Sequence, residues 1–302
     1  MSATTPLYLL SGPTASGKTS VAHLLAERMN LRLLSVDSMM VYQGMDIGTA
    51  KPTPEEIRKY HYAGVNLVSP GERFSTGKWI RQISEQLDER PTLAVGGTGL
   101  YYRAMIDGLP PENSSPSPEA PQSVESLQAR IRELDPTALA TLADPQNPRR
   151  LERALAWLEN GQALPQSWKE RSGFPIAVLR RPTEELNRRI HLRIQEMFAQ
   201  GLLEETRNLL ASGKLEGTAS QAIGYQEAQA VLEKEWGLEK AIEQLSTRTR
   251  RYAKRQRTWF RNQMDARWVD VEKSQNAELI ADKVATIWQE TGPFLFDRSV
   301  YV

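Results

Sequence analysis

The sequence has 302 residues, of which 25% are charged and 40% hydrophobic, and its formal net charge is +1. The composition is that of a globular protein, and the length allows one large α/β domain or a core domain with an insertion. The absence of cysteine excludes disulfides, thiolate metal sites and cysteine nucleophiles. The first apolar run is too short for a signal peptide, and no run has the length of a membrane span. We therefore expect a cytoplasmic protein with no membrane partner.

The first motif is a glycine-rich loop, Gly12-Pro13-Thr14-Ala15-Ser16-Gly17-Lys18-Thr19, between an apolar run at residues 7–10 and a helical pattern. Strand, loop and helix in this order are the context of a phosphate-binding P-loop. The glycines let backbone N–H groups point at an anion, and the helix N-terminus adds a partial positive charge. Lys18 would reach the phosphate oxygens and the Thr19 hydroxyl would hold Mg²⁺. The motif predicts an oligophosphate ligand rather than a plain turn, but it does not say which one.

The following elements alternate between strands and helices. Buried strands are expected at residues 31–36 and 92–95, a helix at 75–88 and a short strand at 65–68. This alternation predicts an α/β fold with a doubly wound parallel sheet. Ligands of such sheets lie beyond the carboxyl ends of the strands, where the P-loop, Asp37 and Thr98 would meet.

The second half of the chain is richer in helices. Residues 110–122 contain five prolines and predict a linker or an exposed loop. We expect three parts: a first part of the P-loop core (1–109), a small helical insertion domain (110–173) and the rest of the core with nucleic-acid-binding helices (174–302). The last part is expected to contain helices at 183–200, 202–212, 225–235, 238–262 and 277–289, and strands at 176–179 and 268–271.

A basic and aromatic segment, RTRRYAKRQRTWFR, occupies residues 248–261 and contains seven basic residues and no acid. At helical spacing Arg250, Lys254, Arg257 and Arg261 share one stripe, where like charges repel. RNA phosphates would relieve this repulsion. The alternative is a surface helix whose aromatic side chains belong to the core. We favour a nucleic-acid partner.

Asp37 follows a predicted strand and would lie beside the P-loop. An aspartate in this position can bind Mg²⁺, position a water molecule, act as a general base for a substrate next to the phosphates, or simply cap its own loop. Position alone does not separate these roles.

Five segments now occur in a characteristic order: GPTASGKT, VDSMMVYQGMDIGTAKP (36–52), VGGTGLYYRA (95–104), AIGYQE (222–227) and KRQRTWFR (254–261). Together they resemble the tRNA dimethylallyltransferase, or tRNA isopentenyltransferase (IPP transferase), family. The resemblance implies transfer of a dimethylallyl group from dimethylallyl diphosphate to the exocyclic amine of the adenosine 3'-adjacent to the anticodon. It also implies that the P-loop holds the diphosphate of this donor rather than ATP, that Mg²⁺ is the cofactor, and that the anticodon stem-loop of tRNA is the partner of a monomer.

The resemblance also implies roles for individual residues. Asp37 is the expected base and Thr98 lies near the adenosine, while Arg189 joins the P-loop at the diphosphate. Arg188 is the rival of Arg189, and an ordinary surface pair of Arg189 with Arg193 is the alternative. Residues expected to face tRNA are Asp37, Ser38, Met39, Met40, Thr98, Arg149, Arg150, Leu151, Glu152, Arg153, Ala222, Ile223, Gly224, Tyr225, Gln226, Glu227, Lys254, Arg255, Gln256, Arg257, Thr258, Trp259, Phe260 and Arg261.

Two features differ from the family pattern. The family usually has a longer helical insertion before its Asp-Pro segment, here Asp135-Pro136, and often a glutamine at the position of Arg149. Arg149 and Arg150 could equally be the charged start of a helix. Both differences concern the grip on the anticodon stem rather than the transfer reaction.

The expected chemistry fits these residue types. The exocyclic amine of adenine is a weak nucleophile, so a base must take its proton while the nitrogen attacks the allylic carbon. The P-loop amides, Lys18 and Mg²⁺ would stabilise the departing diphosphate. A stacked base is out of reach, so we expect it to flip into a channel whose other end admits the donor.

Three other functions fit parts of the sequence. A P-loop kinase or NTPase needs a second acidic Mg²⁺ site, which no segment clearly supplies. An enzyme that prenylates free AMP-type nucleotides does not need the basic and aromatic segment. A non-catalytic RNA-binding protein needs neither the P-loop nor Asp37.

Overall fold

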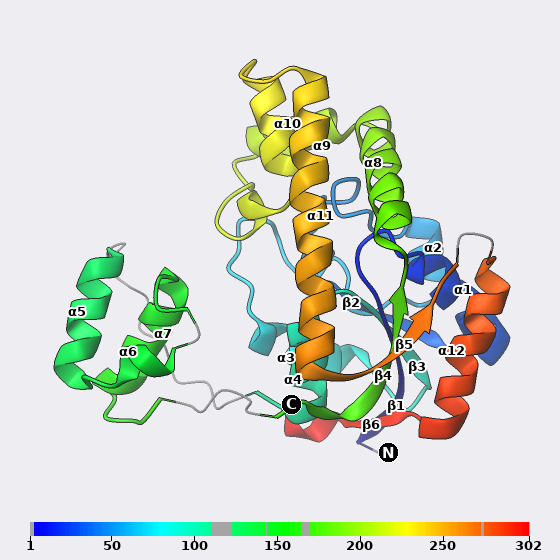
Figure 1. Cartoon of the computed structure of the whole chain (residues 1–302), viewed down its shortest axis with the longest axis horizontal. Coiled ribbons are helices and arrows are strands. Elements are labelled where there is room, and N and C mark those ends of the chain that lie inside the picture. Colours follow the sequence, from blue (N-terminus) through cyan, green and yellow to red (C-terminus); the bar gives the residue numbers. More distant parts are fainter. Residues whose placement is uncertain (1–2, 110–122, 143, 165–169, 273–274, 302) are drawn as a thin grey trace. The chain divides into compact units, whose positions relative to one another are not determined.

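The computed structural model describes residues 3–109, 123–142, 144–164, 170–272 and 275–301, and the chain divides into two compact units. The larger unit comprises Met1–Gly108 and Arg171–Val302, and the smaller is Leu109–Glu170 (Figure 1). The predicted insertion, 110–173, covers almost the same stretch as the smaller unit. The linker expected at 110–122 lies outside the described residues.

The larger unit is built on a parallel sheet, as the sequence predicts. Its five parallel strands follow the order β2-β3-β1-β4-β5. They are β1 (Thr4–Ser11), β2 (Arg32–Val36), β3 (Thr92–Gly96), β4 (Ser172–Arg180) and β5 (Met264–Asp270). Every residue of β3 is buried, which is typical of a parallel strand covered on both faces.

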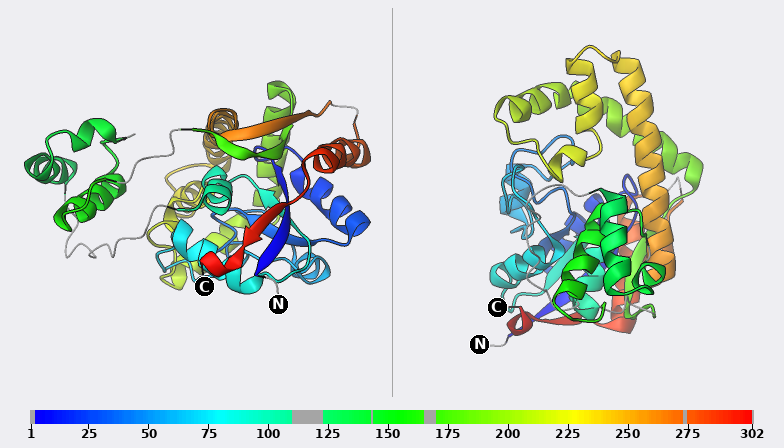
Figure 2. Two further views of the ribbon diagram at one scale, coloured as in Figure 1. Left: turned by 90° about the horizontal axis from the view of Figure 1, so that it is seen from below. Right: turned by 90° about the vertical axis from the view of Figure 1, so that its left-hand side faces the viewer.

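Two groups of helices cover the sheet. On one face α1 (Lys18–Met29) packs against α12 (Ala277–Thr291), and both contribute to a core with Leu93 and Val95 of β3. Since strand side chains alternate between faces, Ala94 points to the opposite face. That face carries α3 (Thr76–Gln86), α4 (Gly99–Asp107) and the foot of α11 (Leu238–Gln263), as Figures 1 and 2 show.

Helix α3 confirms the predicted amphipathic pattern. Trp79, Ile80, Ile83 and Leu87 are all buried. The Trp79 ring stacks on Tyr101 of α4, with ring centroids 4.1 Å apart. The Ser75 side chain caps the helix by accepting the Lys78 N–H. This helix therefore packs on α4.

The remaining helices of the larger unit lie beyond the carboxyl ends of the strands. Helix α8 packs against α11, and α10 contacts both α9 and α11, so these three shorter helices surround the upper half of α11 (Figure 1). Their bounds are Thr183–Ala199 for α8, Leu202–Ala211 for α9 and Tyr225–Leu232 for α10. The short helical segments are α2 (Pro54–Lys59), η1 (Ala219–Gln221) and η2 (Arg298–Val300).

The smaller unit contains three helices with a core of their own. They are α5 (Val124–Leu134), α6 (Ala138–Thr141) and α7 (Pro148–Glu159). The buried residues of this core are Leu127, Ile131, Ala138, Leu151, Ala154 and Leu155. Apolar residues of α5 and α7 recur at helical spacing, which is why both helices could be expected from the sequence.

The strand pattern differs from the predictions in three places. Residues 65–68 form no strand but only an isolated bridge between Tyr42 and Val68. Strand β5 begins directly after α11, earlier than the predicted start at residue 268. The prediction missed its first part because polar residues there interrupt the apolar pattern. Strand β6 (Phe294–Asp297) was not predicted and pairs antiparallel with the first half of β1.

Strand β6 shares one edge of β1 with β4. It covers residues 4–7 of β1, while β4 pairs with Leu10 and Ser11. The rings of Phe174 and Phe294 meet where these two strands approach each other, with centroids 5.2 Å apart. A short strand that completes an edge leaves only a weak period-two pattern in the sequence.

We expect Phe296→Ala to lower the free energy of unfolding by about 3–5 kcal/mol, because a fully buried aromatic ring is removed from the strand that closes this edge. Leu295→Ala is the matched control on the same strand. Leu295 is 61% exposed, so its truncation should change the free energy by less than about 0.5 kcal/mol. Urea denaturation of both variants measures the difference, and equal effects would contradict the assigned register.

Candidate active site

The P-loop connects β1 to α1 and curls around its own centre. The Ser16 N–H donates to the Pro13 carbonyl at 3.1 Å, and the backbone of Ala15 and Gly17 is left-handed, with φ of 61° and 92°. The Ser16 hydroxyl is buried and has no hydrogen-bond partner among the described residues. Such a group costs free energy unless a ligand binds it. The loop therefore has the geometry and the free donor of an oxyanion site.

Three arginines from the neighbouring strand and helix face this loop together with Lys18. Arg181 Nε donates to the Ser16 carbonyl at 2.8 Å, and Arg189 Nε donates to the Ala15 carbonyl at 2.9 Å. A Cβ atom at Gly17 would lie 3.3 Å and 3.7 Å from their Nη2 atoms. Arg193 interacts electrostatically with Lys18. Four cations thus gather where an anion would bind.

These positions separate the arginines that the sequence left open. Arg189 contacts the loop, whereas Arg188 is exposed and pairs with Glu185 on the same helix. Arg181 was not expected from the sequence. The available signal was its place directly after β4, where ligands of parallel sheets bind.

The crowding of cations is visible in the pKa of Lys18. Burial, and to a smaller extent the positive charge of Arg193, lower this pKa to about 8, while the negative charge of Asp37 opposes the shift. Burial also lowers the pKa values of Arg181 and Arg193. An anion bound in the loop would offset this repulsion, so the site is electrostatically prepared for one.

Asp37 and Thr98 lie at the carboxyl ends of β2 and β3 and are linked by the backbone. The Met39 N–H donates to Asp37 Oδ1 at 2.9 Å, so the carboxylate does cap its own loop. The Ser38 N–H donates to Thr98 Oγ1 at 3.0 Å. No hydrogen bond to Asp37 Oδ2 occurs within the described part of the chain. One carboxylate oxygen is therefore left for other chemistry.

Tyr252 of α11 completes this corner of the site. Its side chain interacts with those of Thr98 and Gln256 and, electrostatically, with Asp37. Burial, assisted by the charge of Asp37, raises the pKa of Tyr252, so this hydroxyl keeps its proton. The sequence singled out Tyr252 only as an aromatic residue within the basic segment.

Gln256 of α11 joins the P-loop to the loop after β3. Its Oε1 accepts the Thr14 N–H at 2.9 Å, and its Nε2 donates to the Gly97 carbonyl at 3.0 Å. A Cβ atom at Gly97 would lie 2.1 Å from Nε2, and one at Gly99 would lie 2.0 Å from the Trp259 ring. The glycines of this loop are thus needed because α11 packs directly against the backbone.

The residues predicted to face tRNA differ in exposure. Several have buried side chains, so contacts with an RNA would have to come from their neighbours; these are Leu151, Ala222, Tyr225, Glu227, Gln256 and Phe260. The exposed members are Arg150, Arg153, Gln226, Lys254, Arg255, Thr258 and Arg261, and the rest are half-buried or glycine. The Arg149 side chain lies outside the described residues. Those at 150–153 belong to the smaller unit.

A Mg²⁺ site would depend on the ligand as well as on the protein. No group of three or more His, Asp or Glu side chains suited to a metal occurs in the described ranges. Thr19 lies in the first turn of α1 with its side chain exposed. Because Mg²⁺ at phosphate sites keeps water and phosphate oxygens as ligands, one hydroxyl beside a bound diphosphate fits this ion.

Fold and site together define a P-loop α/β protein whose phosphate loop faces a strand-end carboxylate and a long basic helix. Two family models match the chain: IPP transferase over residues 40–263 and isopentenyl transferase over residues 5–63. The tRNA dimethylallyltransferase of Bacillus licheniformis is 36% identical, over 93% of this chain and 96% of that protein. The Moorella thermoacetica enzyme of the same name is 38% identical, over 91% and 93%.

Solved structures agree with these matches. The tRNA delta(2)-isopentenylpyrophosphate transferase of Staphylococcus epidermidis superposes with a TM-score of 0.68 at 29% identity, over 94% of this chain and 99% of that one. A eukaryotic dimethylallyltransferase acting on tRNA has a TM-score of 0.74 at 22% identity, over 95% of this chain and 79% of that one, and shares the fold. The chain belongs to the IPP transferase family, as its motifs suggested.

One expectation about membranes can be compared with the structure. Within the described ranges, no helix combines the length and the apolar character required to cross a bilayer.

The pKa of Lys18 leads to a pH-dependent affinity for inorganic pyrophosphate. Unliganded Lys18 is charged below pH 8 and loses its proton above it, so the anion should bind more weakly as the pH rises. Between pH 7 and pH 9 we expect the wild type to lose about tenfold more affinity than Lys18→Arg, whose guanidinium stays charged. Titration calorimetry measures the affinity of both proteins, and the ratio of the two affinities does not depend on the ionisation of pyrophosphate itself. Identical pH profiles would contradict the assignment.

Proposed function

We propose that this protein transfers the dimethylallyl group of dimethylallyl diphosphate to the exocyclic amine of an adenosine in tRNA, 3'-adjacent to the anticodon. Its family membership supports dimethylallyl transfer to tRNA. The observation that carries the mechanism is the electrostatic interaction of Lys18, in the phosphate loop, with Asp37 at the end of β2. A leaving-group site and a base would therefore lie close together.

The donor would bind through its diphosphate. The loop offers backbone N–H groups, the unpaired Ser16 hydroxyl and the cations Lys18, Arg181 and Arg189. All of these are donors or positive charges, so they favour the diphosphate more strongly as negative charge builds on it during bond cleavage. Mg²⁺ held by Thr19 and the diphosphate would add electrophilic stabilisation of the leaving group.

The acceptor would react at the Asp37 side of the site. The adenine amine forms a bond to the primary allylic carbon while the bond from that carbon to the diphosphate oxygen breaks. The amine proton passes to Asp37, whose Oδ2 is not used by the capping bond of Oδ1. Thr98 and Tyr252, whose side chains interact with each other, would orient the extruded base.

The basic face of α11 supports a macromolecular acceptor. Lys254, Arg255 and Arg261 are exposed, and none of the three forms an ion pair within the described part of the chain. A free nucleotide would not need such a face, whereas RNA phosphates would neutralise it. A kinase or NTPase is not favoured, because the chain matches the IPP transferase and isopentenyl transferase family models.

We also propose a cellular location and an oligomeric state. The tRNA substrate and the absence of cysteine support a cytoplasmic location. The monomeric state is proposed on the family resemblance alone. The function itself is tested by incubating the protein with dimethylallyl diphosphate and undermodified tRNA, followed by mass analysis of the nucleosides. Robust turnover of ATP without prenylated adenosine would overturn the proposal.

Asp37→Asn should lower kcat by about a hundred- to ten-thousandfold, because the amide keeps the acceptor for the Met39 N–H but is no longer a base. We expect the affinities for tRNA and for pyrophosphate to change little. Single-turnover kinetics and filter binding measure the two effects separately. Normal turnover combined with weak tRNA binding would show that Asp37 is a binding residue rather than the base.

Joint substitution of Lys254 and Arg257 by alanine should weaken tRNA binding and reduce its salt dependence by about one unit of slope for each phosphate that is no longer neutralised. Arg28 and Lys59, on α1 and α2, provide a control pair of equal charge. Binding is measured between about 50 and 200 mM salt. A salt slope equal to that of the control variant would place the RNA elsewhere.

A further inference from the structure

The loop that contains Asp37 is rigidly bonded inside. Lys51 is the centre of this part: its ammonium donates to the Tyr42 carbonyl and Asp46 Oδ1, both at 2.6 Å, and to Asn66 Oδ1 at 2.7 Å. Its side chain is only 1% exposed, and the three bonds use all three of its protons. Residues 42–51 can therefore shift as one body rather than residue by residue.

A single carboxylate attaches this body to the helices behind it. Glu205 of α9 accepts the Asp46 N–H at 3.0 Å and the Ile47 N–H at 2.8 Å through Oε2, and the Gly48 N–H at 3.1 Å through Oε1. Its Oε1 also accepts the Tyr225 hydroxyl at 2.7 Å. Four charge-assisted hydrogen bonds make this the strongest polar attachment of the loop.

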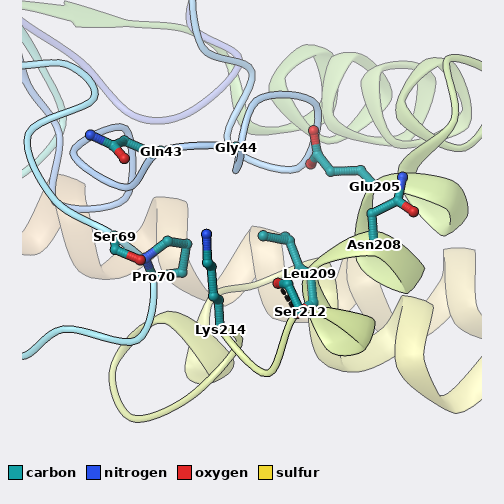
Figure 3. Close-up of a pocket in the computed structure, with 9 residues that line it drawn as sticks. All are labelled: Gln43, Gly44, Ser69, Pro70, Glu205, Asn208, Leu209, Ser212 and Lys214. Atoms are coloured by element: carbon teal, nitrogen blue, oxygen red, sulfur yellow. Dashed lines mark hydrogen bonds between the residues drawn. The ribbon is translucent and has the colours of Figure 1, made fainter.

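A hollow borders the same attachment. Glu205 lines a pocket of about 310 Å³ together with Gln43, Gly44 and Leu209, and Figure 3 shows its side chain at one end of that hollow. The nearest Leu209 methyl would be 3.9 Å from a Cβ atom at Gly44. Beside this hollow, the hydrogen bonds of Glu205 and the packing of Gly48 on the Tyr225 ring together hold the loop.

Tyr225 connects the carboxylate to α10. The tyrosine is fully buried, and a Cβ atom at Gly48 would lie 2.6 Å from its ring, so the loop rests on this ring. Burial raises the pKa of Tyr225, which keeps its hydroxyl a donor. Tyr225 begins α10, between half-buried Ile223 and exposed Gln226. These two belong to the segment expected to contact tRNA.

Helix α10 is in turn fixed to the basic helix. Glu227 is buried, accepts the Gly224 N–H at 2.9 Å through Oε2, and accepts Arg248 Nη1 of α11 at 2.6 Å through Oε1. Two sets of polar contacts, joined by the backbone of α10, thus connect α11 to Glu205 and the loop of Asp37.

We propose that Glu205 and Tyr225 are positioning residues that couple RNA contact at α10 to the placement of Asp37. The pair does not touch either substrate; it holds residues 46–48, and through them the loop that carries the base. The inference deepens the proposed function and rests on it only for the identity of the acceptor as tRNA. Contact at Ile223 and Gln226 fixes α10, and Glu205 passes that order to the catalytic loop.

Glu205→Gln tests the coupling. The glutamine amide nitrogen is a donor, so it would face backbone N–H donors that the carboxylate oxygen now accepts. We expect kcat/KM for tRNA to fall by about ten- to a hundredfold, since small displacements of reacting groups have effects of this size. The affinity for dimethylallyl diphosphate should not change. Tyr225→Phe removes one hydrogen bond and should cost about fivefold, with no further decrease in the double variant. Glu204→Gln is the control, since Glu204 is exposed on the same helix.

Amide hydrogen exchange of residues 46–48 provides a readout that does not need turnover. In the wild type these amides should become more protected on adding tRNA, and in Glu205→Gln this increase should be absent. Unchanged kinetics in Glu205→Gln and Tyr225→Phe would overturn the proposal, as would equally weakened binding of donor and tRNA with a lower melting temperature. If protection in the wild type increases with tRNA but no prenyl group is transferred, the proposed function fails and the coupling stands.

Discussion

Repulsion among the positive charges at the P-loop is the constraint on which the site depends. Lys18, Arg181, Arg189 and Arg193 converge on the loop, and burial already lowers the pKa of Lys18 to about 8. These charges lie close together because β1 and β4 end, and α8 begins, at the same edge of the sheet. A bound diphosphate would relieve this repulsion, so part of the folding free energy would be converted into affinity for it.

Helix α11 connects the donor side of the site to the acceptor side. Its outward residues are basic, while Gln256 binds the P-loop backbone and the loop after β3. RNA bound along the exposed face would therefore contact the same rigid element that determines the position of the phosphate site. This arrangement explains why one segment combines lysines and arginines with buried glutamine and aromatic residues: the two faces of the helix have different tasks.

The loop of Asp37 is the other half of this arrangement. It contains no regular secondary structure between β2 and α2. Lys51 nevertheless forms hydrogen bonds within the loop, and Glu205 of α9 binds its backbone. Polar anchors suit a loop that must present backbone and carboxylate groups to a substrate, because they fix its position without filling the space in front of it. The position of the Asp37 loop thus depends in part on Glu205, a residue distant from it in the sequence.

The sequence by itself determined the parallel α/β core, the P-loop, the order of the helices and the family, because apolar periodicity, glycine spacing and local motifs are properties of short segments. It missed β6 and the place of Arg181 beside the P-loop, and it preferred Arg189 to its rival Arg188 only on the family resemblance. It also assigned Gln256 and Tyr225 to an RNA-facing surface, although their side chains are buried. Only the tertiary structure decided these points, since they depend on contacts such as Gln256 with Thr14 and Glu205 with Gly48, which join residues far apart along the chain. A local sequence pattern does not predict which distant backbone group will form a hydrogen bond with a buried polar side chain.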